Sequence, residues 1–104
     1  MMLLGDYFNN IKNSYKKFFF SGISFNNNLV KKDNIFFAIK GNKVDGNNFI
    51  LSAIKNGAKI IVTEKKKNGL KNDILFIRSK NVRKLLAEIS FKIYNNIPKN
   101  IIAV

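Results

Sequence analysis

Apolar residues gather along the chain in short runs that predict buried strands. The runs lie at residues 35–39 (IFFAI), 59–63 (KIIVT) and 74–77 (ILFI). Short runs rich in β-branched and aromatic residues are typical of strands that are covered on both faces of a sheet. The pattern therefore predicts three interior strands.

Between these runs, apolar residues recur at helical spacing. A first helix is expected over residues 49–54, with Gly57 placed to end it in a left-handed conformation. A second helix is expected to begin after Asn81, whose side chain can cap it, and to stop at Pro98. Its apolar face consists of Val82, Leu85, Leu86, Ile89 and Ile93. Strands that alternate with helices predict a three-layer α/β domain with a largely parallel sheet.

The remaining segments carry weaker patterns. An opening helix is predicted from the spacing of Leu4, Phe8, Ile11 and Tyr15. Residues 18–25 favour a strand, and three consecutive Asn residues at 26–28 favour a turn. Residues 64–73 are charged and contain a glycine, which predicts a surface loop. A further strand is expected to begin at residue 100.

Composition excludes several kinds of site. The chain has neither Cys nor His, which excludes disulfides, a cysteine nucleophile, a histidine base and the common zinc sites. No apolar run approaches the roughly 20 residues that a membrane-spanning helix needs. The first residues are too short a segment for a signal peptide. We therefore expect a cytoplasmic protein that does not bind a membrane.

The formal net charge of +13 raises the question of nucleic-acid binding. Nearly all of this charge is Lys, and the only Arg residues are Arg78 and Arg83. Lys, Asn, Ile and Phe share A/T-rich codons, so a compositional bias of the genome accounts for their joint abundance. We expect no nucleic-acid partner, and a small basic nucleic-acid-binding module remains an alternative.

Residues that carry chemistry are sparse. The six carboxylates are scattered, and none forms a pair at the spacing of a metal site or an acid–base pair. Asp45, next to Gly46, is as typical of a turn or a helix cap as of a ligand. Asn42 and Lys43 follow a predicted strand and precede a helix, and ligands of open α/β sheets bind at that edge. An ordinary strand-to-helix connection explains the same residues equally well.

A longer pattern resembles the start of the Mur ligases of peptidoglycan synthesis. Residues 24–50 (SFNNNLVKKDNIFFAIKGNKVDGNNFI) continue through LSAIKNGAKIIVTE at 51–64. The family has an Asp-Ser-Arg segment, a "G-D-[LI]-F-x-A-x-x-G" strand, a "D-G" pair, a helix ending in "A-x-x-G-A" and a strand ending in Glu. Here Asp33-Asn34 stands in place of the family's Gly-Asp. The spacing of Tyr94 and Pro98 ahead of an apolar strand resembles the corresponding segment of the ligase that adds the third peptide residue.

The resemblance implies where a substrate binds. The family's Asp-Ser-Arg segment corresponds to residues 26–28, so Phe25 and Asn27 occupy positions that contact the uridine end of the substrate. Asn28 replaces the family's Arg and carries no charge. Asn42, Lys43 and Val44 follow the loop glycine and correspond to residues that line the nucleotide site. No catalytic residue and no metal ligand is expected in this chain.

The resemblance also implies a function for the whole protein. The implied substrate is UDP-N-acetylmuramoyl-L-alanyl-D-glutamate, to which the ligase joins diaminopimelate or lysine with ATP and Mg²⁺. Residues 1–99 are expected to hold the UDP-substrate, and residues 100–104 to begin an ATP-binding domain whose phosphate loop follows Val104. The chain by itself, which needs no cofactor, is expected to be inactive. The alternatives are the sister ligase that adds D-alanyl-D-alanine, the nucleic-acid-binding module, and a domain with a structural role only.

Overall fold

The computed structural model describes residues 1–95, so Pro98 and the predicted strand at 100–104 lie outside the described residues. The centre of the fold is a five-stranded sheet of order β3-β4-β5-β7-β6. Four of its strands are parallel, and β6 at one edge is antiparallel to β7. The strands are β3 (Gly22–Ser24), β4 (Asn34–Phe37), β5 (Ile60–Thr63), β6 (Gly69–Lys71) and β7 (Ile74–Arg78). The predicted α/β fold with a largely parallel sheet is confirmed.

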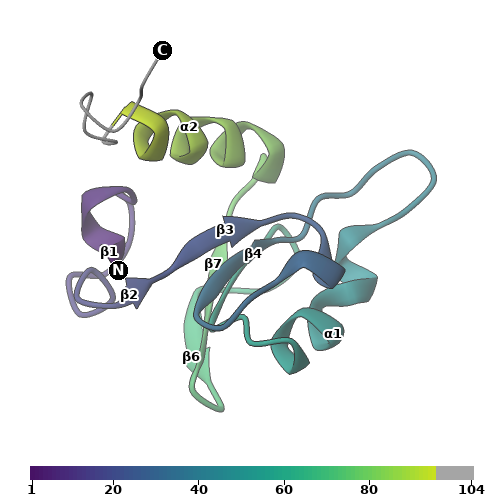
Figure 1. Ribbon diagram of the computed structural model, residues 1–104, viewed down its shortest axis with the longest axis horizontal. Coiled ribbons are helices and arrows are strands. Elements are labelled where there is room, and N and C mark those ends of the chain that lie inside the picture. The colour runs from purple at the N-terminus through teal and green to yellow at the C-terminus, as the bar shows by residue number, and fades with distance from the viewer. Residues whose placement is uncertain (96–104) are drawn as a thin grey trace, which may run out of the picture.

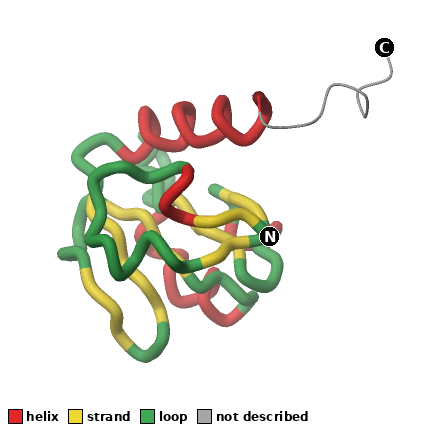
Figure 2. Tube along the Cα trace, turned by 90° about the vertical axis from the view of Figure 1, so that its left-hand side faces the viewer, coloured by secondary structure: helices red, strands yellow, loops and turns green. Residues whose placement is uncertain are grey.

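Helices cover both faces of this sheet, which makes three layers. The helix α1 (Ile50–Lys55) lies on one side and α2 (Val82–Asn95) on the other (Figure 1). Figure 2 shows the strands between these helices. No helix within residues 1–95 is long and apolar enough to cross a membrane.

The strands are buried on both faces because alternate side chains enter different cores. Ile35 and Phe37 of β4 join the core under α2, whereas Phe36 between them joins the core under α1. All four residues of β4 and all four of β5 are buried. This arrangement explains why these strands appear in the sequence as continuous apolar runs.

The ends of the helices follow the predicted capping chemistry. The Asn81 side-chain oxygen accepts a hydrogen bond from the Lys84 backbone N–H at 3.0 Å, so Asn81 caps α2. Gly57 follows α1 with a φ of 120°, a conformation in which glycine has no steric cost. Both predictions of helix ends are confirmed.

The predicted opening helix is wrong. The segment forms β1 (Met2–Leu3), a 3-10 helix at Leu4–Asp6 and then turns, and β1 pairs antiparallel with β2 (Phe19–Phe20). The backbone N–H groups of Leu4 and Gly5 donate to the carbonyls of Phe18 and Lys16 at 2.7 and 3.0 Å, so the chain reverses here instead of continuing as a helix. The four apolar residues behind the prediction nevertheless pack at the core under α2; they are Leu4, Phe8, Ile11 and Tyr15.

Two other segments differ from the predicted pattern. The expected strand over residues 18–25 is divided at Ser21 into β2 and β3, which belong to different sheets. The expected surface loop over residues 64–73 contains β6, the antiparallel edge strand. Gly69-Leu70-Lys71 is too short and too polar to show a strand period, and its pairing with β7 determines its conformation.

Candidate functional site

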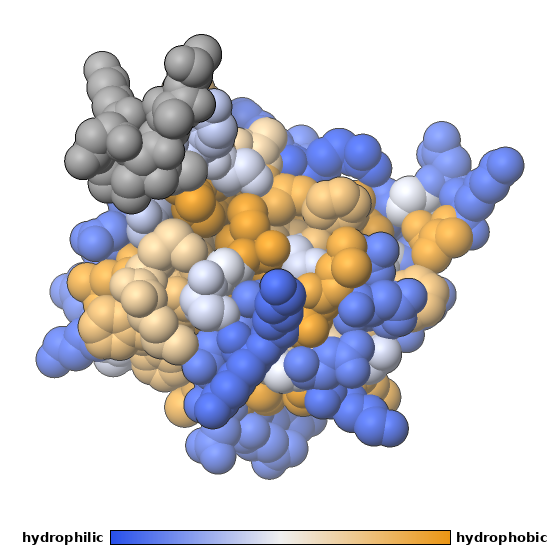
Figure 3. Space-filling model, viewed as in Figure 1, coloured by the Kyte–Doolittle hydropathy of each residue, from blue (hydrophilic) through white to orange (hydrophobic). Residues whose placement is uncertain are grey.

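A groove opens where β3 and β4 end, beside the first half of α2. Its volume is about 520 Å³, and it is lined by Phe25, Asn27, Gly41, Val44, Arg83 and Leu86 among others. We call it the carboxyl-edge groove because it lies at the carboxyl ends of parallel strands, where open α/β sheets bind their ligands. In the space-filling view, apolar residues gather between α2 and the strands β3 and β4 (Figure 3).

The groove brings together three of the five predicted substrate-binding residues. Phe25 and Asn27 reach it from the segment after β3, and Val44 reaches it from the loop after β4. Asn42 and Lys43 are exposed and do not line it. Phe25 and Val44 are apolar yet 66% and 58% exposed, so both offer contact area to a ligand.

The turn that carries Asn27 is held against α1. The Asn27 side-chain N–H donates to the Ser52 hydroxyl at 3.0 Å, and the Asn56 side chain donates to the Asn27 carbonyl at 2.8 Å. Asn26 caps the turn by accepting from the Asn28 backbone N–H at 2.9 Å. Within residues 1–95, the Asn27 side-chain oxygen accepts no hydrogen bond.

Arg83 is a groove residue that sequence reasoning did not select. It lies in the first turn of α2, is exposed, and lines the carboxyl-edge groove. A guanidinium binds phosphate oxygens in a bidentate manner, which a lysine ammonium cannot do. The available signal was its residue type, since only Arg78 and Arg83 interrupt a basic composition dominated by Lys.

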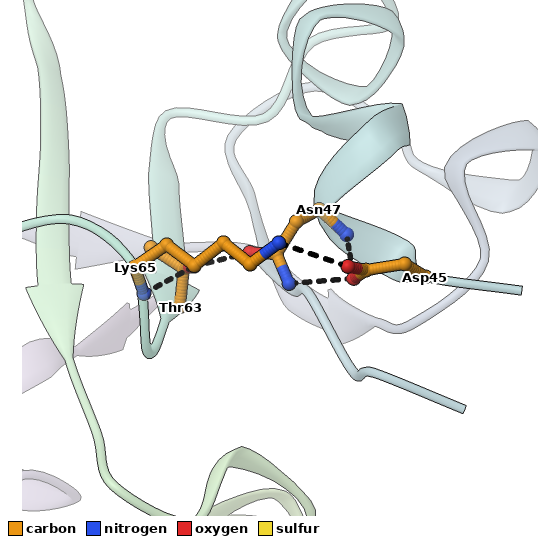
Figure 4. Close-up of polar contacts among 4 residues, drawn as sticks. All are labelled: Asp45, Asn47, Thr63 and Lys65. Carbon is orange, nitrogen blue, oxygen red and sulfur yellow. Dashed lines mark hydrogen bonds and ion pairs between the residues drawn. The ribbon is translucent and has the colours of Figure 1, made fainter. Parts of the chain in front are cut away.

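A polar cluster fixes the loop that supplies Gly41 and Val44. The buried Thr63 hydroxyl, at the end of β5, donates to the Asn47 side-chain oxygen, and the Lys65 backbone N–H donates to Thr63 at 3.1 Å. Asp45 accepts from the Asn47 backbone and side chain at 2.9 and 2.7 Å, and from the Lys65 ammonium at 3.0 Å (Figure 4). We call Asp45, Asn47, Thr63 and Lys65 the loop clamp.

The loop clamp changes the acidity of Asp45. Hydrogen bonds from the Asn47 side chain and backbone, followed by that from Lys65, lower the pKa of Asp45 from 3.8 to about 2. Next to the clamp, the Gly46 N–H donates to the Ile39 carbonyl at 2.8 Å. The loop is therefore tied to β5 by side chains and to the end of β4 by backbone.

Comparison with known families identifies the chain. A model described as "Mur ligase family, catalytic domain" matches residues 20–98. The chain belongs to the Mur ligase family. The match includes β3, β4 and α2, the elements around the carboxyl-edge groove, and leaves out most of the amino-terminal segment.

Several curated relatives carry the same printed name. The chain is 40% identical over 95 residues to "UDP-N-acetylmuramoyl-L-alanyl-D-glutamate--2,6-diaminopimelate ligase" of Rickettsia prowazekii (strain Madrid E). It is 42% identical over 93 residues to the protein of that name from Clostridium tetani (strain Massachusetts / E88). These matches cover 91% and 88% of this chain but 19% of each relative. The chain thus spans about a fifth of the length of these Mur ligases.

Solved structures of Mur ligases share the fold. MurF ligase from Thermotoga maritima, in complex with ADP, matches with a TM-score of 0.59 and 28% identity over 71% of this chain and 17% of that chain. A MurF structure from Acinetobacter baumannii matches with a TM-score of 0.57 at 20% identity. At this identity the match shows a shared fold only.

Proposed function

We propose that this chain is the substrate-holding part of the Mur ligase that adds the third peptide residue of peptidoglycan. Its substrate would be UDP-N-acetylmuramoyl-L-alanyl-D-glutamate, and the residue added by the whole enzyme would be diaminopimelate or lysine. The printed name of the relatives supports this choice of ligase. The observation that carries the proposal is the carboxyl-edge groove, lined by Phe25, Asn27 and Val44.

The chemistry of the groove suits the nucleotide end of this substrate. Phe25 and Val44 offer apolar contact to a uracil ring, and the Asn27 side-chain oxygen offers an acceptor for the ring N–H or a ribose hydroxyl. Arg83 supplies a fixed positive charge for the diphosphate. Asn42 and Lys43 lie in the same loop as Val44, and we propose that they contact parts of the substrate beyond the groove.

The described residues offer no cluster of side chains for a divalent metal ion. Within residues 1–95, no group of three or more His, Cys, Asp or Glu side chains is placed to hold a metal ion. We therefore propose that ATP and Mg²⁺ bind to parts of the whole enzyme outside these residues. On this account residues 1–99 hold the substrate, residues 100–104 begin the ATP-binding domain, and the chain alone has no ligase activity. The whole enzyme would act in the cytoplasm, where its nucleotide substrates are found.

The sister ligase, which adds D-alanyl-D-alanine, is the second candidate. The fold match to MurF from Thermotoga maritima favours it. The identities of 40% and 42% to the diaminopimelate ligases, against 28% to that MurF, favour the first candidate. A chain that binds the UDP-linked tripeptide more tightly than the UDP-linked dipeptide would be evidence for the sister ligase.

The two arginines provide a matched test of the proposed site. Arg83→Met should weaken binding of the UDP-linked dipeptide, measured by calorimetry, by about tenfold or more, because a hydrogen bond to a charged group contributes about 1.5–3 kcal/mol. Arg78→Met removes the same charge at the end of β7, outside the groove, and should change the affinity by less than about twofold, as an exposed charge does. Equal losses from both variants would exclude a specific diphosphate site at Arg83.

A further inference from the structure

The sheet face that carries α1 is only partly covered. Parallel neighbouring strands are usually joined by a crossover of a dozen or more residues that contains a helix. Here β5 and β7 are parallel neighbours, but residues 64–73 join them through the edge strand β6. The helix that would cover β7 on this face is therefore replaced by a strand, and α1 has six residues.

A groove occupies the place of that helix. Its volume is about 690 Å³. Ile74 and Phe76 of β7, both half-buried, form its floor, and Ile50, Leu51 and Ile54 of α1 form one wall. We call it the α1 groove. The helix α1 that lines it lies on the opposite face of the sheet from α2 (Figure 1). Leu51 is 81% exposed, so the wall offers apolar area that this chain leaves in water.

The other side of the α1 groove is basic. Lys66, Lys67 and Lys71 line it and are exposed. None of the three forms an ion pair or a side-chain hydrogen bond with any of residues 1–95, in contrast to Lys59 and Lys65, which pair with Asp33 and Asp45. No Asp or Glu is among the residues that line the groove. Its charge is therefore uncompensated within the described chain.

We propose that the α1 groove binds an acidic amphipathic helix of a partner protein. Such a helix would lie over β7 beside α1, where neighbouring helices pack about 8–10 Å apart. Its apolar side would cover Ile74, Phe76 and Leu51, and its carboxylates would face the three lysines. A concave groove favours an inserted helix over a flat lipid surface, which contacts protruding side chains.

A model peptide tests the proposal on the 104-residue chain. The probe is a fluorescent amphipathic peptide of about 15 residues with Leu at helical spacing and Glu elsewhere, a length at which helices become marginally stable. The control probe has Lys in place of each Glu. Fluorescence anisotropy should show saturable binding of the acidic peptide and none of the basic peptide. Equal binding of the two peptides, or of neither, would overturn the proposal.

Charge-matched variants locate the binding. Changing Lys66, Lys67 and Lys71 together to Glu should weaken binding of the acidic peptide by about tenfold or more, because three attractive charge pairs would be replaced by repulsion between like charges. The same triple change at the exposed residues Lys12, Lys17 and Lys31 alters the net charge equally and should cost less than about threefold. If both triple variants lose equal affinity, the attraction is a general property of a basic protein and the site is wrong.

An apolar pair of variants completes the test. Leu51→Asp should abolish peptide binding, whereas Phe91→Asp on α2, where the side chain is 68% exposed, should not. Both residues are exposed, so neither change should prevent folding, which thermal melts will check. Co-sedimentation with phosphatidylglycerol vesicles, without peptide binding, would identify a lipid surface as the partner and overturn the proposal.

Discussion

Gly46 is the position where a single added methyl group tests the architecture of the loop after β4. A Cβ atom at Gly46 would lie 2.7 Å from both the nitrogen and the oxygen of Ile39, and 3.2 Å from the Ala38 carbonyl carbon. All three are backbone atoms at the end of a buried strand, so no side chain can rotate away. Gly46→Ala therefore has to displace the loop or break the hydrogen bond from the Gly46 N–H to Ile39.

The expected cost follows from the cost of overpacking. Forcing an extra carbon into a packed site typically costs about 1–3 kcal/mol. For a domain of this size, each kcal/mol lowers the melting temperature by about 4–8 °C. Gly46→Ala should therefore lower the melting temperature, measured by circular dichroism, by at least about 4 °C. Because the loop supplies Gly41 and Val44, the variant should also bind the UDP-linked dipeptide more weakly.

Gly69 provides the matched control. A Cβ atom there meets no heavy atom within 4 Å, and Gly69 lies in the edge strand β6. Glycine inside a strand is about 0.5–1 kcal/mol less stable than alanine, so Gly69→Ala should melt at or above the wild-type temperature. If Gly46→Ala and Gly69→Ala have the same melting temperature, the close contact between residue 46 and the end of β4 is not present in solution.

Three further perturbations test other parts of the account. Because the folded-state pKa of Asp45 is about 2 rather than 3.8, its ionised form stabilises the fold above pH 3.8 and this stabilisation is lost as the pH falls through 2. The difference in melting temperature between wild type and Asp45→Asn should accordingly shrink over that range, and a constant difference would contradict the loop clamp. Ile61→Ala, at a fully buried position of β5, should lower the free energy of unfolding, measured in urea, by about 2–5 kcal/mol. Leu51→Ala, at an exposed position, should change it by no more than about 0.5 kcal/mol. Equal urea midpoints for the two variants would refute the assigned core. Asn27→Ala should weaken binding of the UDP-linked dipeptide by roughly two- to tenfold, because it removes one uncharged hydrogen bond. Lys66→Ala in the α1 groove should leave the affinity for this dipeptide unchanged. A loss of affinity from Lys66→Ala but not from Asn27→Ala would show that the dipeptide does not bind at the carboxyl-edge groove.

The parts of the fold that the sequence predicts well are those in which local pattern and tertiary burial agree. Residues 35–39 and 59–63 are apolar throughout, and β4 and β5 are interior strands with two packed faces. The amino-terminal segment could not be predicted in this way. Its apolar spacing fits a helix, but the pairing of β1 with β2 involves residues nearly twenty positions apart and leaves no mark on local periodicity.

One departure from the family pattern has a backbone explanation. Asp33 occupies the place of the family's Gly, and its φ of 66° lies in the left-handed region that glycine adopts freely. Asp tolerates this region better than most residues do. Asp33 therefore adopts, directly ahead of β4, a backbone conformation that glycine would adopt without steric cost.

The site could be predicted only as far as the family segments reach. Phe25, Asn27 and Val44 were predicted because the resemblance to the Mur ligases places them at positions that contact the nucleotide, and all three line the carboxyl-edge groove. Arg83 escaped prediction because it lies on α2, far along the chain, and only the packing of α2 beside β3 and β4 brings it to the groove. The α1 groove was not foreseeable because it depends on β6 taking the place of a helix.

The most direct measurement of the central claim is a titration of the 104-residue chain with UDP-N-acetylmuramoyl-L-alanyl-D-glutamate, followed by backbone amide shifts in NMR. If the chain holds the UDP-substrate, shifts are expected at residues 25–28, at residues 41–46 and around Arg83, which surround the carboxyl-edge groove. Residues 66–71 beside the α1 groove should remain unchanged. Shifts confined to residues 66–71, or no shift at substrate concentrations that saturate a whole Mur ligase, would contradict the claim that this chain holds the UDP-substrate.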